Sequence, residues 1–516
     1  MPKWIEEAVF YEIYPQSFMD SNGDGIGDFQ GIIEKLDYIK ELGCNAIWMN
    51  PCFDSPFADA GYDVADYYKA APRYGTNEDL KELFKEAHKR YMRVVLDLVP
   101  GHTSVEHAWF KESMKAEKNE FSDRYVWTDS IWEGFDNVTS IAGCIRGISD
   151  RNGSCAVNFF SSQPALNYGF AKVEKSWQLP VDSKEAIATR EAIKDIMRFW
   201  LELGCDGFRV DMAGSLIKND EGSVETIKLW QNFREFLDKE FPEAVIISEW
   251  GEPDKSLLAG FHMDFVLHFG PSHYLDLFRC ENPFFSKKGK GDISQFIETY
   301  MNNYRLTDGK GLICIPSGNH DMDRISRRLD EEELKIAFAF LLSMPGSPFI
   351  YYGDEIGMKY LEGITSVEGG YERTGARTPM QWNNEKNAGF SSANESDLYI
   401  MQDSSGDRPT AEQMQEDKDS LWHEIQTLIR IRMKEDALCA NGKIEVLYAE
   451  QNKYPLIYKR TGSSDSIVVI INPSAEKIEC QVKEEAKEAI YAYNQPAVIE
   501  NGIVTVYPCS ATFIRV

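Results

Sequence analysis

Four short apolar segments, each followed by polar side chains, constrain the fold of this chain more than any other feature. The segments span residues 94–96, 207–210, 245–248 and 312–315, and helical patterns separate most of them. Runs of this length and composition predict buried β-strands. In chain order, the polar side chains at or after their ends are Asp97 and His102, Arg209 and Asp211, Glu249, and His320 and Asp321. Because the carboxyl ends of parallel barrel strands share one face, these residues predict an active site.

The rest of the chain repeats the same alternation of strand and helix. Further strand-like runs at 9–14, 46–49, 265–267 and 349–352 bring the candidate strands to eight, and the last helix is predicted at 421–433. The expected fold class is α/β, with a closed parallel (β/α)8 TIM barrel.

Two stretches depart from this alternation. The segment between the third strand and its helix is too long for a simple loop, which predicts a small inserted domain. Near the C-terminus the pattern changes to β-like alternation, as in 466–472 and 503–507, which predicts an antiparallel β-sandwich. We expect the barrel at 1–103 and 176–440, the inserted domain at 104–175 and the C-terminal domain at 441–516.

The charge of the chain excludes some classes of partner. With 55 Lys and Arg against 83 Asp and Glu, the net charge is −28. Such a surface should repel nucleic acid and anionic lipid, whereas a neutral sugar would be indifferent to it. No apolar run approaches the roughly 20 residues of a membrane helix, and the N-terminus has no stretch of signal-peptide type. We expect a cytoplasmic protein, and the sequence leaves its oligomeric state open.

Asp211 and Glu249 supply the pair of acids that cleavage of an acetal bond requires. One carboxylate attacks the anomeric carbon while a protonated carboxyl delivers a proton to the leaving oxygen. Arg209 lies on the same strand face as Asp211, and its charge would keep Asp211 ionised as the nucleophile. Glu249 lies between apolar residues and Trp250, which suits a carboxyl that stays protonated. Taken singly, either acid could instead be a cap or turn residue.

These residues lie in four ordered motifs that resemble the signature regions of the alpha-amylase family of glycoside hydrolases. The motifs are Asp97-Leu-Val-Pro-Gly-His102, Gly207-Phe-Arg-Val-Asp211, Ser248-Glu249-Trp250 and Gly318-Asn-His-Asp321. Stretches at 61–63, 163–167, 345–355 and 376–382 support the likeness, which covers residues 8 to about 440. The chain is most similar to the oligo-1,6-glucosidase and α-glucosidase branch, which also carries an inserted domain after the third strand.

The resemblance implies roles for the polar residues around the two acids. Asp321 resembles the family's third carboxylate, which holds sugar hydroxyls as the ring flattens, and Asp97 resembles the acid that supports the site through the arginine. His102 and His320 resemble the sugar-contacting histidines, and Tyr62 the aromatic platform for the glucosyl ring. Without the resemblance, the histidines could be satisfied core residues and Tyr62 ordinary aromatic core.

Asp63 and Arg377 bear on how such an enzyme would treat a sugar chain. In the exo-acting glucosidases that this sequence resembles, an Asp after Gly-Tyr and the Arg of Arg-Thr-Pro-Met-Gln-Trp bind the non-reducing glucose and close the pocket behind it. The alternative is an ordinary ion pair between loops. The segment 357–382 would cover the pocket, and loops at this face of a barrel commonly set specificity.

The segment 20–28 places oxygen-bearing residues at alternate positions, with glycines that permit a tight turn. Such a loop suits a hard cation, and it is similar to the calcium loop of the oligo-1,6-glucosidase branch. A surface turn rich in Asp, Asn and Gly is the alternative. We expect no organic cofactor, and a structural Ca²⁺, or Mg²⁺, held by Asp20, Asn22, Asp24, Ile26 and Asp28.

Two residues depart from the family pattern. Met212, directly after the expected nucleophile, is neither the Val associated with α-1,6 linkages nor the small residue or Thr often seen with α-1,4 linkages, so linkage preference is open. Ala165 replaces the Asp of the usual Gln-Pro-Asp-Leu-Asn motif, which leaves open how that loop is tied to the barrel.

The expected function is a retaining, exo-acting α-glucosidase that hydrolyses short malto- or isomalto-oligosaccharides by double displacement. Deep closure against water would favour a trehalose synthase-like isomerase or transglucosidase. An open cleft, or loss of the contact between Asp63 and Arg377, would favour an endo-acting α-amylase. The barrel also occurs as a non-catalytic partner domain in amino-acid transporter heavy chains, but those lack the full set of acids and carry a membrane helix.

Overall fold

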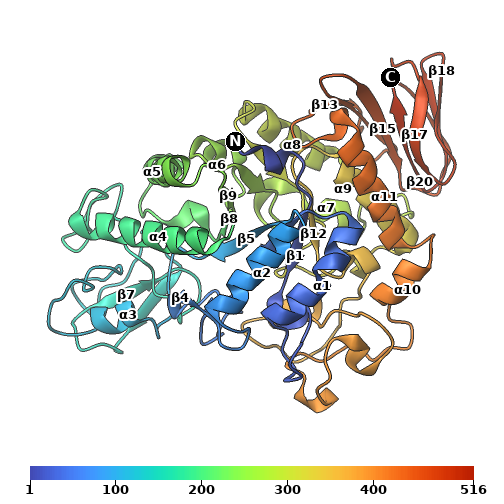
Figure 1. Ribbon diagram of the computed structural model, residues 1–516. Helices are drawn as coiled ribbons and strands as arrows, with labels where there is room; N and C mark the ends of the chain where they lie inside the picture. The colour runs from blue at the N-terminus through green and yellow to red at the C-terminus, as the bar shows by residue number, and fades with distance from the viewer.

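The computed structural model describes residues 1–516, and its centre is a parallel β-barrel (Figure 1). The eight strands pair in the order β11-β10-β9-β8-β5-β2-β1-β12, and a parallel bridge between Pro316 and Phe349 joins the two ends. The predicted fold class is confirmed. The strands are β1 (Phe10–Ile13), β2 (Ala46–Met49), β5 (Arg93–Leu98), β8 (Gly207–Val210), β9 (Val245–Ser248), β10 (Met263–Phe265), β11 (Leu312–Cys314) and β12 (Phe349–Tyr351).

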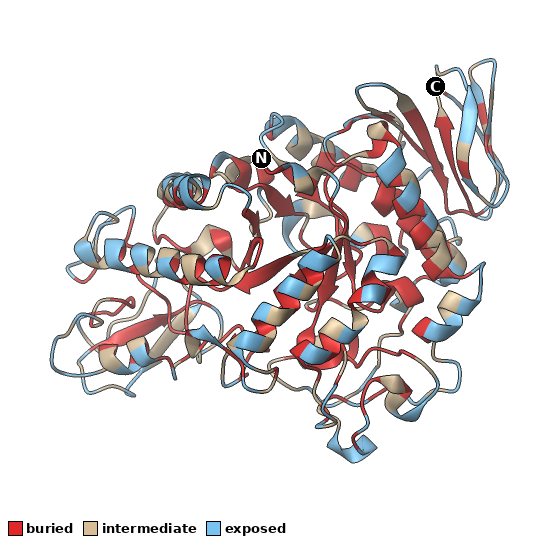
Figure 2. Ribbon diagram, in the orientation of Figure 1, coloured by how far each residue is buried: buried red, intermediate tan, exposed pale blue.

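A helix follows each barrel strand and packs on the outside of the barrel. These helices are α1 (Phe29–Leu42), α2 (Asn77–Lys89), α4 (Lys184–Leu203), α5 (Val224–Glu240), α6 (Pro253–Leu258), α8 (Ser294–Leu306), α9 (Glu331–Ser343) and α11 (Leu421–Lys434), with the short α7 (Leu275–Phe278) before α8 and α10 (Ala411–Glu416) before α11. Figure 2 shows most of them buried on one side and exposed on the other, as amphipathic helices should be. None of the helices is both long and apolar enough to cross a membrane.

Local sequence fixes where these helices begin. The Asp28 side chain accepts a hydrogen bond from the Gly31 N–H at the start of α1. At α2, Thr76 and Asp79 form a reciprocal capping box, which satisfies two backbone donors that the first turn leaves free.

Strand β10 lies two residues earlier than the apolar run at 265–267 predicts. The strand contains Asp264, a fully buried acid that breaks the apolar pattern. Its carboxylate accepts hydrogen bonds from the Ser248 hydroxyl (2.7 Å) and the Trp250 N–H (3.1 Å). Asp264 therefore links β10 to the residues on either side of Glu249.

The segment expected as an inserted domain contains α3 (Ala108–Ser113) and the antiparallel pair β6 (Gly143–Arg146) and β7 (Ser154–Val157). It packs near the short pair β3 (Phe53–Asp54) and β4 (Asp66–Ala70), which follows β2. An antiparallel bridge joins Ala165 to His102, and Gln163 Nε2 donates to Asp59 Oδ2 at 2.8 Å. These contacts tie the loop to the barrel without the missing Asp.

The C-terminal region is an antiparallel β-sandwich, as predicted. Buried side chains such as Val468, Ile470 and Val504 pack between its two sheets, whose orders are β13-β14-β15-β20-β17 and β16-β19-β18. The strands are β13 (Lys443–Tyr448), β14 (Leu456–Thr461), β15 (Ser466–Asn472), β16 (Ile478–Gln481), β17 (Glu488–Tyr493), β18 (Val498–Glu500), β19 (Ile503–Val506) and β20 (Ser510–Arg515).

Two buried arginines bind carbonyl oxygens at the end of α9, and the one from the sandwich joins that domain to the barrel. Arg432 in α11 donates to the carbonyl oxygens of Leu342 and Met344, at 2.9 Å each. Arg460 in β14 donates to the carbonyl oxygens of Ser343 and, at 2.7 Å, Cys439. One continuous hydrophobic core contains side chains of both the barrel and the sandwich.

Candidate active site

A cavity of about 1060 Å³ opens at the carboxyl ends of the barrel strands. Its walls come from the loops after β2, β5, β8, β9, β10, β11 and β12. Five of the residues that the sequence singles out line it, namely Tyr62, His102, Asp211, Glu249 and Asp321. The strand-end residues therefore meet in one place, as parallel barrel geometry requires.

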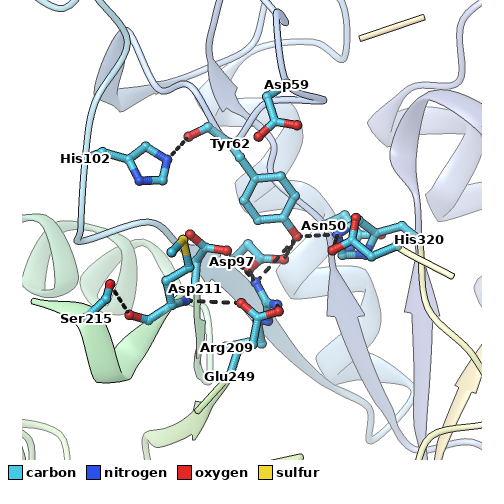
Figure 3. Close-up of polar contacts among 12 residues, drawn as sticks. Asn50, Asp59, Tyr62, Asp97, His102, Arg209, Asp211, Ser215, Glu249 and His320 are labelled. Atoms are coloured by element: carbon cyan, nitrogen blue, oxygen red, sulfur yellow. Dashed lines mark hydrogen bonds and ion pairs between the residues drawn. The ribbon is translucent and has the colours of Figure 1, made fainter. Parts of the chain in front are cut away.

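Arg209 lies at the centre of a charged cluster on the floor of this cavity (Figure 3). Its side chain is 2% exposed, and Nη1 lies 2.8 Å from Asp97 Oδ1 and 3.3 Å from Asp211 Oδ1. Nη2 lies 2.9 Å from Glu249 Oε1. Because Asp97 and Arg209 are register partners in β5 and β8, and Arg209 and Asp211 share a strand face, the contacts follow from the strand pairing.

The pKa of Asp211 is shifted in the direction opposite to the one that Arg209 alone would give. Burial, and then the Glu249 carboxylate, raise the pKa of Asp211 well above its usual value, and Arg209 offsets this only in part. The sequence could show the arginine but not the burial. Two carboxyls that repel each other in a buried site favour one shared proton. One carboxylic acid beside one carboxylate is also the charge state that acid-assisted displacement requires.

Glu249 is held by the backbone of the residue that follows Asp211. Met212 has a left-handed conformation (φ 46°), and its N–H donates to Glu249 Oε2 at 3.1 Å. The Met212 side chain also lines the cavity. A residue at this position therefore both orients the second acid and shapes the pocket.

Asp321 is held by two arginines and a histidine on one wall of the cavity. Its Oδ1 lies 2.5 Å from Arg373 Nη1 and 3.0 Å from Arg377 Nη2, and its Oδ2 lies 3.3 Å from His320 Nε2. Burial works against ionisation, but His320 and the two arginines outweigh it, so the pKa of Asp321 is well below its usual value. Asp321 is therefore a fixed negative charge beside the other two acids.

Tyr62 forms one face of the site and rests on His320. The two rings are stacked with centroids 5.3 Å apart, and the Tyr62 hydroxyl lies 2.7 Å from His320 Nε2. His320 has no exposed surface, and its Nδ1 lies 2.9 Å from Glu12 Oε1. Burial lowers the pKa of His320 well below its usual value, and it lowers the pKa of His102 to about 4. His102 is therefore neutral, and it alone of the two histidines faces the cavity.

The expected contact between Asp63 and Arg377 is not formed, and neither residue lines the cavity. Asp63 is fully buried, and its carboxylate accepts from the backbone N–H groups of Ala58 (2.9 Å) and Asp59 (3.0 Å). Arg377 is 1% exposed and donates to the His320 carbonyl oxygen at 2.6 Å as well as to Asp321. In this structure Asp63 therefore supports the main chain and Arg377 supports Asp321, and their contact with a sugar stays a prediction.

Asp59 and Arg373, which the sequence reasoning missed, line the cavity in their place. Arg373 Nη2 lies 3.6 Å from Asp59 Oδ1, while Nη1 contacts Asp321. Asp59 lies four residues before Asp63, and Arg373 lies four residues before Arg377. The sequence held a signal, since a second residue of the same charge lies just before each of the two motifs.

The loop at 20–28 turns tightly, but the protein itself engages its oxygen atoms. Asp20 accepts from the backbone N–H groups of Gly23 (2.7 Å) and Gly25 (2.8 Å). Asp28 caps α1 and accepts from the Ser21 hydroxyl at 2.8 Å. No three acidic, histidine or cysteine side chains converge as a cation site. The residue types suit calcium, but in this arrangement the expected ligands do not form a cage.

A parallel barrel with two carboxylates beside one arginine, and a third acid across the cavity, defines an enzyme that cleaves glycosidic bonds. The chain belongs to the alpha-amylase family, because the family described as "Alpha amylase, catalytic domain" matches residues 12–441. The predicted resemblance is confirmed.

The relatives fall into hydrolases and isomerases. The oligo-1,6-glucosidase of Heyndrickxia coagulans is 31% identical over 93% of this chain and 93% of its own length. The trehalose synthase/amylase TreS of Mycolicibacterium smegmatis is 33% identical over 77% of this chain and 70% of its own length. Among solved structures, the trehalulose synthase MutB from Pseudomonas mesoacidophila MX-45 superimposes with a TM-score of 0.82 at 25% identity, covering 100% of both chains. The protein is therefore a glycoside hydrolase or transglucosidase of the alpha-amylase family.

Proposed function

We propose that this protein is a retaining, exo-acting α-glucosidase that releases glucose from the non-reducing end of short malto- or isomalto-oligosaccharides. The observation that carries the proposal is the group of Asp59, Arg373 and Asp321 on one wall of the cavity. Ionised groups that already contact one another bind the adjacent hydroxyls of a terminal sugar through charge-assisted hydrogen bonds. The oligo-1,6-glucosidase relatives agree with this substrate class.

Asp211 and Glu249 carry out the two displacements in this proposal. Asp211 attacks the anomeric carbon and forms a covalent glucosyl-enzyme, while the Glu249 carboxyl gives its proton to the leaving oxygen. Glu249 then removes a proton from water, which displaces Asp211 and releases glucose with the original α configuration. The contacts of Arg209 with both acids support a close spacing of the pair.

The remaining residues bind the ring rather than transfer protons. Tyr62 offers an aromatic face to the apolar side of the glucosyl ring. His102, neutral and at the cavity wall, suits a hydrogen bond to a sugar hydroxyl. Asp321, held ionised by its arginines, would stabilise the positive charge that develops on the ring.

An isomerase or transglucosidase is the second candidate. The similarity to TreS and to trehalulose synthase favours it, as do the exposed aromatic side chains of Phe159, Phe269 and Tyr371 at the cavity wall, which could exclude water from the glucosyl-enzyme. Both candidates share the first displacement and differ in the acceptor.

An endo-acting α-amylase is the third candidate, and the missing contact between Asp63 and Arg377 would favour it if considered alone. The pair of Asp59 and Arg373 instead supplies the charged wall on which an exo-acting enzyme depends. We therefore retain the exo-acting proposal.

A product time course with anomers resolved by NMR tests the proposal on maltotriose, isomaltotriose and soluble starch. Early α-glucose from one trisaccharide, with little attack on starch, supports it and identifies the linkage. Early β-glucose would contradict the retaining mechanism, and mixed oligosaccharides from starch would indicate an endo-acting enzyme. Conversion of maltose to trehalose, or of sucrose to an isomer, without release of glucose would establish the second candidate.

A further inference from the structure

The guanidinium of Arg373 is held by the main chain of its own loop. Arg373 Nη2 donates to the Gly369 carbonyl oxygen at 2.7 Å, while Nη1 contacts Asp321. The position of Arg373 on the cavity wall therefore depends on where Gly369 lies.

A buried ion pair anchors the residue before Gly369. Glu368 Oε1 lies 2.6 Å from Arg73 Nη1, and the two side chains are 2% and 21% exposed. The Tyr399 hydroxyl donates to the same Glu368 oxygen at 2.7 Å. The Arg73 guanidinium lies 3.6 Å from the centre of the Phe57 ring, a cation–π contact. The anchor therefore joins three chain segments: the loop after β4, the loop of Arg373 and the segment before α10.

The anchored turn also packs directly against the segment of Asp59. Glu368 has a left-handed conformation (φ 50°) and is followed by Gly369 (φ 62°). A Cβ at Gly369 would lie 3.2 Å from the Ala58 carbonyl oxygen and 3.2 Å from Asp59 Oδ1. A non-glycine residue with positive φ is held by its surroundings at some cost, and here the ion pair supplies that restraint.

We propose that Arg73 and Glu368 are positioning residues that determine how closely Arg373 approaches Asp59 and Asp321, and so whether the pocket accepts only the end of a glucan chain. Neither residue lines the cavity, so both act through the main chain at 368–370. This inference rests on the proposed function. It adds the ion pair that would set the preference of the enzyme for the ends of glucan chains.

The test compares Glu368→Gln with Glu362→Gln as a matched control. Glu362 lies in the same loop and pairs with Arg327 at 2.7 Å, but its side chain is 66% exposed. We expect Glu368→Gln to raise KM for the trisaccharide by about tenfold, to leave kcat within about threefold, and to release longer oligosaccharides from soluble starch. The control should match the wild type in all three measurements.

Gly369→Ala is a second variant that perturbs the same turn without touching the ion pair. It should reproduce the rise in KM and the change in starch products. Arg73→Lys keeps the charge of the ion pair, so it should raise KM less than Glu368→Gln does. An unchanged KM and product pattern in both Glu368→Gln and Gly369→Ala would overturn the proposal, as would a fall in kcat alone. All variants are assayed on the glycoside that the wild type converts. If the proposed function is wrong, the wild type itself gives other products. If only this inference is wrong, the wild type behaves as proposed and the variants do not differ from it.

Discussion

Arg209 Nη2 lies 2.9 Å from Glu249 Oε1. The same guanidinium contacts Asp211 through Nη1, so one fixed positive charge serves both acids of the proposed mechanism. Glu249 contributes to the raised pKa of Asp211, and variants of the two acids should fail in different ways.

Glu249→Gln should lose the acid step but keep the nucleophile. We expect hydrolysis of oligosaccharides to fall by about 10²- to 10⁴-fold, whereas a p-nitrophenyl α-glucoside, whose leaving group needs no proton, should still give a burst of p-nitrophenol. Asp211→Asn should give no burst, with a loss on the order of 10⁴-fold or more. Rapid-mixing kinetics measure both, with Asp238→Asn in an exposed surface pair as control. Equal losses of Glu249→Gln on both substrates would contradict its role as the acid.

The pH dependence of KM should report Asp59. Burial raises the pKa of Asp59 to about 6, although Gln163 and Arg373 lower it in part. As the pH falls through this value Asp59 becomes neutral, and its attraction to Arg373 and its capacity to accept from sugar hydroxyls both weaken. KM for the oligosaccharide should therefore rise below about pH 6. In Asp59→Asn, KM should be high and lack this inflection; persistence of the inflection would assign it to another group.

Asp63→Asn should damage stability rather than substrate binding. The Asp63 carboxylate accepts from two backbone N–H groups in the loop after β2, and an amide supplies only one oxygen as acceptor. We expect the free energy of unfolding to fall by about 1–3 kcal/mol, measured by urea denaturation, with KM little changed. A raised KM at unchanged stability would mean that Asp63 reaches the sugar after all.

Calcium should stabilise the fold if the loop at 20–28 opens to hold it. A ligand at about 100 times its Kd stabilises the folded state by about 2.7 kcal/mol, so Tm in excess CaCl₂ should exceed Tm in EDTA by several degrees. Asp24→Ala should remove the difference. Asp24 suits this test because its side chain only accepts locally from Ile26, whereas Asp28 also caps α1. Identical melting of the wild type in both solutions would exclude the site.

The barrel and the three catalytic candidates could be predicted because their signals are local. A strand end is marked by a short apolar run, and the period of the strand places Arg209 and Asp211 on one face. Closure of the barrel then brings the strand ends together, whatever the intervening loops do.

The position of Asp59 at the cavity wall, in place of Asp63, depends on contacts that the sequence does not display. Both are acids in the same loop, and the backbone N–H groups of Ala58 and Asp59 bind the Asp63 carboxylate, which leaves Asp59 facing the cavity. The raised pKa of Asp211 and the position of β10 were missed for a related reason. Each depends on burial or pairing across the barrel rather than on neighbours along the chain.

The carbonyl groups at the end of α9 bind arginines from α11 and from the sandwich. Helix ends leave such groups without partners of their own, so the last domain completes a helix of the barrel. A chain shortened at residue 441 would therefore lack Arg460 and expose apolar surface of α9 to water. We expect such a fragment to aggregate on expression rather than yield a smaller enzyme.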